Sequence, residues 1–112
     1  MDSISTHKPT DVADRLLALA RLYREGQASE LMGRTLDKLL AQEIERSQAQ
    51  LGQLQTDLRS FETQYDLASD EFYRRFQAGQ MDDRMDFVEW ASLVQMRDNL
   101  QARLQLLTGQ AA

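Results

Sequence analysis

The chain has 112 residues, a formal net charge of −5 at pH 7, one histidine and no cysteine, which excludes disulfide bonds, a thiolate nucleophile and a cysteine-built zinc site. The length suits one ordinary domain or two small modules, and 42% of the residues are apolar, enough for a core. Because no apolar run is long enough to span a membrane and no signal peptide is recognisable, we expect a cytoplasmic, non-enzymatic protein without a cofactor.

The first predicted helix covers about residues 11–24. Pro9 precedes Thr10, which is a suitable N-cap residue, and Asp11 suits the first turn of a helix. Apolar residues then recur at helical spacing, namely Val12, Leu16, Leu19, Ala20 and Tyr23. Gly26 is placed to end this helix in the left-handed conformation.

A second helix is predicted from an N-cap at Ser29 to Tyr65, provided that the chain stays helical through Gly33 and Gly52. At 1.5 Å per residue such a helix is about 55 Å long. Its first part carries a broad apolar stripe suited to a globular core. From Leu40 onward the steps alternate between four and three residues, typical of a coiled-coil seam, with one polar position: Leu40, Ile44, Ser47, Leu51, Leu54, Leu58, Phe61 and Tyr65. A seam this narrow needs a partner helix.

Two further helices are predicted, one from an N-cap at Ser69 to a stop at Gly79 and one over about residues 87–107. Asp86 and Glu89 resemble a capping box for the last helix. This helix matches the seam of the long helix in length, so the simplest burial is an antiparallel hairpin. The predicted fold is therefore mainly α: a short helix pair in residues 1–40, one long central helix, and a C-terminal antiparallel hairpin in residues 41–112.

The net charge is unevenly distributed. Residues 1–38 hold six acidic and six basic residues, whereas residues 39–112 hold the other twelve acidic residues and seven basic ones. The whole excess of negative charge therefore lies in the C-terminal two-thirds. An acidic segment attracts a basic protein and repels nucleic acid, although a solvated, solubilising surface explains the same charge.

Few residues suggest catalysis or metal binding. Asp82, Asp83 and Asp86 spell DDxxD, a pattern that binds magnesium diphosphate in prenyl-transfer enzymes. A chain of this length cannot enclose an isoprenoid cavity and has no second aspartate-rich motif, so we interpret these residues as favouring a helix start. The single histidine, His7, has no nucleophile or carboxylate at a recognisable spacing. We expect neither a catalytic residue nor a metal site.

Aromatic residues are concentrated around the predicted turn between the last two helices: Phe72, Tyr73, Phe76, Phe87 and Trp90. One interpretation is a hydrophobic plug that closes the end of the hairpin. The other is a partner-binding knob, because tryptophan and tyrosine are preferred interface anchors. The sequence leaves both interpretations open.

Residues 9–22 and 26–39 (PTDVADRLLALARL and GQASELMGRTLDKL) resemble the two helices of a ribbon-helix-helix repressor. The resemblance implies a dimerisation module, which we assign to Leu16, Leu19, Leu31, Leu36 and Leu39. It also implies an N-terminal strand over Ser3 to Lys8, whose outward face would read DNA through Ser3, Ser5 and His7. The balanced charge of residues 1–38 predicts weak affinity for phosphate.

Residues 61–79 (FETQYDLASDEFYRRFQAG) and 85–93 (MDFVEWASL) resemble the C-terminal part of small prokaryotic antitoxins that are encoded beside an RNase-like toxin, including the TumA-type partners of TumE-type toxins. The resemblance implies a type II antitoxin that forms a homodimer or higher oligomer, binds a cognate basic toxin and represses its operon. The partner-binding residues would be Phe72, Tyr73, Phe76, Asp82, Asp83, Asp86, Phe87 and Trp90. The alternative is a structural or adaptor homo-oligomer whose seam pairs between chains.

Overall fold

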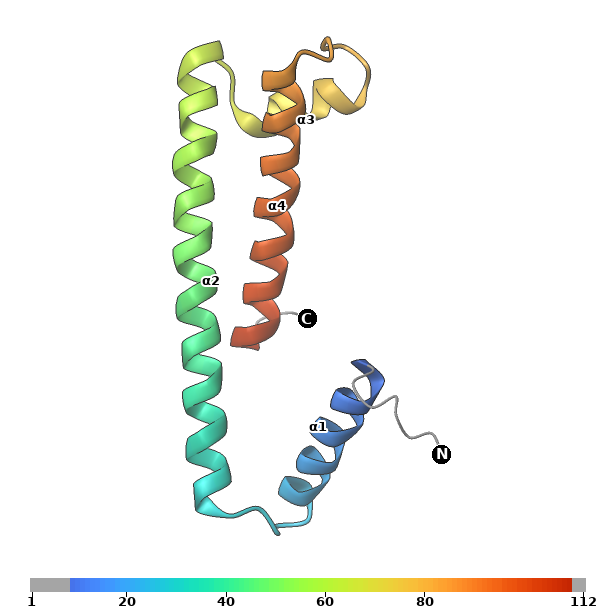
Figure 1. The fold of residues 1–112 in the computed structure, drawn as a ribbon, viewed down its shortest axis with the longest axis vertical. Coiled ribbons are helices and arrows are strands. Elements are labelled where there is room, and N and C mark those ends of the chain that lie inside the picture. The colour runs from blue at the N-terminus through green and yellow to red at the C-terminus, as the bar shows by residue number, and fades with distance from the viewer. Residues whose placement is uncertain (1–8, 110–112) are drawn as a thin grey trace. The chain divides into compact units, whose positions relative to one another are not determined.

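The computed structural model describes residues 9–109 and contains four helices within them: α1 (Pro9–Arg24), α2 (Glu30–Tyr65), α3 (Ser69–Gln77) and α4 (Met85–Thr108) (Figure 1). This part of the chain contains no strand. The strand expected over Ser3 to Lys8 lies outside the described residues. The chain divides into two compact units, the first ending at Leu39 and the second beginning at Leu40.

Local signals correctly predicted several helix ends. The backbone N–H of Met32 donates to the Ser29 hydroxyl oxygen at 3.1 Å, so Ser29 caps the start of α2 as predicted. The helix then continues without a break through Gly33 and Gly52 to Tyr65. Gly109 follows the last turn of α4 with φ of 74°, a conformation that costs glycine little. Two other predicted stops, Gly26 and Gly79, are also left-handed.

The predicted N-cap Thr10 is wrong because α1 already includes Pro9, and two predicted N-caps of the second unit are wrong because tertiary contacts use their side chains. Ser69 lies inside the first turn of α3, and its hydroxyl accepts a hydrogen bond from the Trp90 indole nitrogen at 3.0 Å. Glu62 of α2 takes over the expected role, since its carboxylate accepts the Ser69 backbone N–H at 3.0 Å. Asp86 likewise lies within α4, which follows Arg84 with no side-chain cap. Helix starts in the second unit are therefore held by neighbouring helices.

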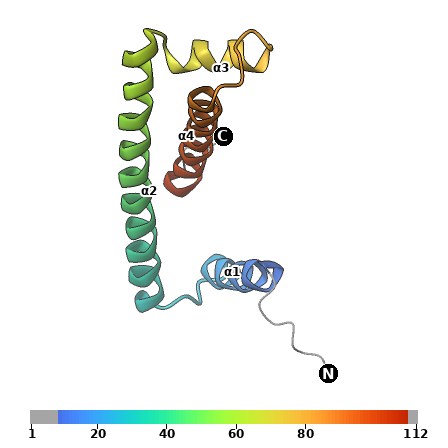
Figure 2. The same ribbon diagram turned by 45° about the horizontal axis from the view of Figure 1, so that its top comes forward.

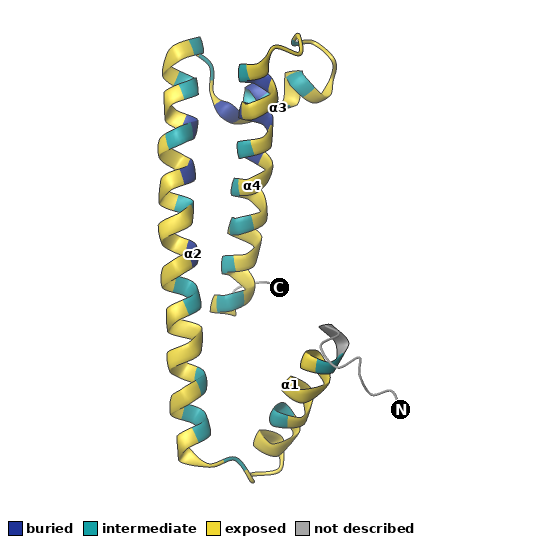
Figure 3. Cartoon of the chain, viewed as in Figure 1, coloured by how far each residue is buried: buried dark blue, intermediate teal, exposed yellow. Residues whose placement is uncertain are grey.

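The first unit, by contrast, has little interior. Between Asp11 and Leu39 no side chain is fully buried (Figure 3). A contact between its two helical segments involves Gly33, where an added methyl group would lie 3.3 Å from the Tyr23 hydroxyl oxygen. The absence of a side chain at Gly33 therefore leaves room for the Tyr23 hydroxyl.

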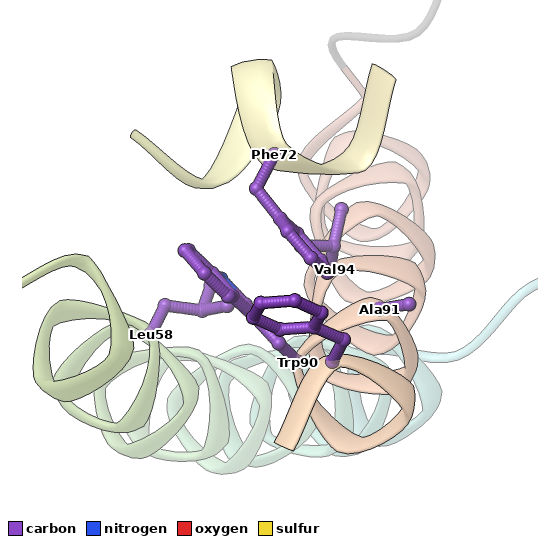
Figure 4. Close-up of a cluster of buried hydrophobic side chains, with 6 residues drawn as sticks. Leu58, Phe72, Trp90, Ala91 and Val94 are labelled. Atoms are coloured by element: carbon purple, nitrogen blue, oxygen red, sulfur yellow. The ribbon is translucent and has the colours of Figure 1, made fainter. Parts of the chain in front are cut away.

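The second unit contains the hydrophobic core. Its α2 segment and α4 run side by side in opposite directions, as the predicted hairpin requires, and α3 crosses the end of the pair (Figures 1 and 2). The rings of Phe72 and Trp90 stack with centroids 3.9 Å apart and planes 2° from parallel. Side chains from all three helices complete this core, namely Leu58, Phe72, Phe87, Trp90, Ala91 and Val94 (Figure 4).

Replacement of Ser69 by alanine should destabilise the protein. The variant leaves the buried indole N–H of Trp90 without an acceptor, which costs about 1–3 kcal/mol. Urea unfolding followed by circular dichroism measures the loss. The matched control is Ser60→Ala, because Ser60 is an exposed serine of α2. Equal unfolding midpoints for the two variants would contradict this role of Ser69.

Candidate partner-binding end of the hairpin

The site proposed from sequence lies where α3, the following loop and the start of α4 meet the end of α2; we call this region the aromatic end. Phe72 and Trp90 are 0% exposed and Phe87 is 5% exposed. In the folded chain these three side chains therefore have no surface to offer a partner. Their burial corrects the expectation that they anchor a partner directly, and it agrees with the plug interpretation.

Two other aromatic side chains reach the surface. Tyr73 and Phe76 of α3 are half-buried and pack against the core. The Tyr73 hydroxyl accepts hydrogen bonds from Gln77 at 3.0 Å and from Gln95 of α4 at 2.8 Å, which fixes the orientation of its ring. The Phe76 ring lies 5.6 Å from that of Phe72. Tyr73 and Phe76 are therefore the aromatic residues of the site that can contact a partner.

Sequence reasoning missed exposed apolar residues at the start of α4. Met85 is 79% exposed, and Val88 one turn later is also exposed. No periodicity singles them out, because apolar residues surround this helix. Their exposure depends on which face of α4 packs against the other helices, and the sequence does not specify that face.

Asp82 is bound by a neighbouring arginine. Its carboxylate accepts hydrogen bonds from the backbone N–H, Nε and Nη2 of Arg84, at 3.1, 2.9 and 2.8 Å. The side-chain bond from Arg84, helped by the backbone bond, lowers the pKa of Asp82 to about 2. The Arg84 guanidinium also lies 4.6 Å from the centre of the Phe87 ring. Asp82 therefore organises the loop before α4, and its charge is offset locally.

Asp86 ties α4 to α2. The Tyr65 hydroxyl donates to its carboxylate at 2.5 Å, and the Gln64 amide donates at 3.4 Å. The hydrogen bond to Asp86, together with burial, raises the pKa of Tyr65 above its ordinary value, against a smaller opposing effect of Arg84. Asp86 is half-buried, so its main contacts are structural.

The acidic residues differ in their intrachain partners. Glu71 forms ion pairs with Arg74 and Arg75, and the bonds to these arginines lower its pKa. Within residues 9–109, Asp83 and Glu89 are exposed and make no side-chain hydrogen bond or ion pair. Asp83 is thus the predicted acidic residue that stays available to a partner. Glu89 is a second one, which the sequence had suggested only as a capping residue.

The three aspartates of the DDxxD pattern do not form a metal cluster. Asp82 is directed to Arg84 and Asp86 to Tyr65. No group of three or more metal-ligating side chains is found in the part of the chain that the structure describes. Among the same residues, no helix is both long and apolar enough to cross a membrane.

The residues assigned to dimerisation remain largely uncovered. Leu16, Leu31 and Leu39 are exposed, whereas Leu19 and Leu36 are half-buried. The last two line a small apolar cavity of about 220 Å³ together with Leu31, Met32 and Thr35. The assigned DNA-reading residues Ser3, Ser5 and His7 lie outside the described residues. No family model, curated protein or solved structure matches the chain.

The Tyr65–Asp86 bond should give the protein an alkaline pH dependence. Because folding raises the pKa of Tyr65, the bond stabilises the fold fully below the ordinary tyrosine pKa of about 10 and stops doing so as the pH rises through the raised value. An ultraviolet titration should show a tyrosine that ionises above the ordinary pKa, which we assign to Tyr65. Asp86→Ala should move that step to lower pH, while Asp83→Ala leaves it in place. Identical curves for Asp86→Ala and the unmodified protein would exclude this effect.

Proposed function

We propose that this chain is a type II antitoxin that binds and neutralises a small RNase-like toxin through its C-terminal hairpin. The proposal rests on the two segments that resemble antitoxins, residues 61–79 and 85–93. Aromatic residues of these segments come from three helices and pack into one cluster: Phe61, Tyr65, Phe72, Phe76, Phe87 and Trp90. Matching residues that pack together in one cluster support a shared role more strongly than matching residues that are scattered over the structure.

The charge of the second unit supports a basic partner. The whole excess negative charge of the chain lies in residues 39–112. A toxin that cleaves RNA needs cations to bind phosphate, and opposite charges accelerate protein association. Asp83 and Glu89 are exposed in the loop before α4 and in its first turns, and they form no ion pair with a described residue. In this proposal they face the cations of the toxin.

Apolar contacts would supply most of the affinity. The exposed parts of Tyr73 and Phe76 on α3, with Met85 on α4, offer aromatic and apolar surface. Interface energy is concentrated in a few such residues, particularly aromatic ones. The buried stack of Phe72 and Trp90 acts indirectly, because it fixes α3 against α4.

Charge reversal at Glu89 should weaken toxin binding. We expect Glu89→Lys to raise the dissociation constant about tenfold, equivalent to about 1.4 kcal/mol, and most strongly at low salt. The partner is the product of the neighbouring open reading frame, co-expressed with this chain and captured with it. The matched control is Glu45→Lys, because Glu45 is an exposed glutamate of α2 away from the aromatic end.

Two results would contradict this proposal. One is unchanged toxicity of the neighbouring gene product in cells that make this protein. The other is an equal loss of binding in Glu89→Lys and Glu45→Lys, because it would show that only the overall charge matters.

The second candidate is a structural or adaptor homo-oligomer, and the exposed leucines of the first unit favour it. Of the twelve exposed large apolar side chains in the described residues, seven lie in the first unit, between Val12 and Leu39. Apolar surface concentrated in this way marks an interaction site. Self-association is compatible with the antitoxin proposal, in which Leu16, Leu19, Leu31, Leu36 and Leu39 form a homodimer. DNA binding by Ser3, Ser5 and His7 rests on the resemblance to ribbon-helix-helix repressors alone.

A charged residue at Leu16 should reduce the oligomer mass. Leu16 is 53% exposed, and a glutamate there would be desolvated in the dimer. We expect Leu16→Glu to lower the mass measured by sedimentation equilibrium. Ala18→Glu should leave the mass unchanged, because Ala18 is exposed and lies on the opposite side of α1 from the apolar stripe that contains Leu16. Equal masses for the two variants would remove this leucine from the interface.

A further inference from the structure

Helix α4 carries more apolar surface than its packing uses. Its buried face contacts α2 and α3 through Phe87, Trp90, Ala91 and Val94. A second stripe runs along the same helix at steps of three and four residues, namely Leu93, Met96, Leu100, Leu104 and Leu107. None of these five is fully buried, and Met96 is 50% exposed. Such a stripe has the spacing of a helix-packing seam.

This second stripe borders a groove between α2 and α4. The groove has a volume of about 570 Å³ and an apolar floor formed by Leu54, Leu93, Met96 and Leu100. Its charged lining residues are Asp57 and Arg103, and the other three lining side chains are uncharged amides. A hairpin of two helices forms a single layer, so this side of it lacks the covering layer that helix bundles have.

The charges of the groove fit a second copy better than a basic partner. The two charged lining residues have opposite signs, and Glu43, the partner of Arg103, lies outside the lining, so the groove lacks the cluster of carboxylates that would favour a basic partner. Asp57 and Arg103 also lie toward opposite ends of the groove. Arg103 pairs with Glu43 at 2.6 Å, and Asp57 lies fourteen residues further along α2, about 21 Å along the helix axis. Met96 lies between these ends.

We propose that this groove binds the same groove of a second copy of the chain, with the two hairpins antiparallel and related by a two-fold axis near Met96. This arrangement brings Asp57 of each copy level with Arg103 of the other. Arg103 donates to Glu43 through Nη2, and a guanidinium has five N–H donors, so donors remain for Asp57. Helices α2 and α4 of the two copies then form a four-helix bundle in which the apolar linings of the two grooves face each other.

The proposed contact is separate from the apolar surface of the first unit and from the aromatic end. It involves neither the leucines of the first unit nor the aromatic end, so it does not rest on the antitoxin function. An antiparallel pair of hairpins would place two aromatic ends at opposite ends of the bundle, each free to bind a partner. Together with the dimerisation leucines it would allow assemblies larger than a dimer.

Sedimentation equilibrium of the full chain tests the proposal through Met96→Glu. Two glutamates brought together near the two-fold axis should halve the mass of the assembly or raise its dissociation constant at least 100-fold. The matched control is Leu106→Glu, because Leu106 is a 72% exposed leucine of the same helix outside the groove. Circular dichroism establishes that both variants keep their helices.

A second measurement uses the absence of cysteine from the chain. Under mild oxidation, Met96→Cys should form a disulfide-linked dimer, whereas Leu106→Cys should stay a monomer on a denaturing gel. Unchanged mass in Met96→Glu together with no dimer from Met96→Cys overturns the proposal. Loss of toxin capture in Met96→Glu at unchanged mass also overturns it, since the groove then binds the toxin. Failure of the unmodified chain to capture the toxin contradicts only the antitoxin function.

Discussion

The second unit depends on the burial of Trp90. Its indole stacks on Phe72 of α3, lies 5.5 Å from the ring of Phe61 of α2, and donates its N–H to Ser69. One side chain of α4 thus contacts both other helices of the unit. An indole N–H can be buried without a large penalty only if it has an acceptor, so Ser69 must be buried with it. The position of α3 follows from these two requirements.

The remaining polar contacts reinforce the same arrangement. Glu62 satisfies the first backbone N–H of α3, and Tyr65 of α2 binds Asp86 of α4. At the periphery, the half-buried Arg97 of α4 bridges Asp70 and Asp98. The aromatic end is therefore a small rigid body held from three sides. The backbone that carries the exposed side chains of α3 and the start of α4 is held by these contacts, an arrangement that would lower the entropic cost of the proposed binding.

The two units differ in how far they bury their apolar side chains. The second unit buries a continuous aromatic and aliphatic cluster within one chain. The first unit has no fully buried side chain between Asp11 and Leu39 and exposes many of its leucines. Two short helices cannot bury enough apolar surface to offset the loss of chain entropy. This imbalance is the physical reason to expect that the first unit is completed by another copy.

The sequence by itself determined the four helices, because apolar spacing, Ser29 and the glycines after the helices are local signals that act within one turn. It also predicted the pairing of α2 with α4, since a narrow seam requires a partner. Only the tertiary structure decided which residues of the aromatic end are accessible. Phe72 and Trp90 share their residue types with interface anchors, and burial alone distinguishes them from Tyr73 and Phe76. The roles of Ser69 and Asp86 were likewise decided by side chains that are close in space, Trp90 and Tyr65, and a contact over twenty residues leaves no periodic trace in a single sequence.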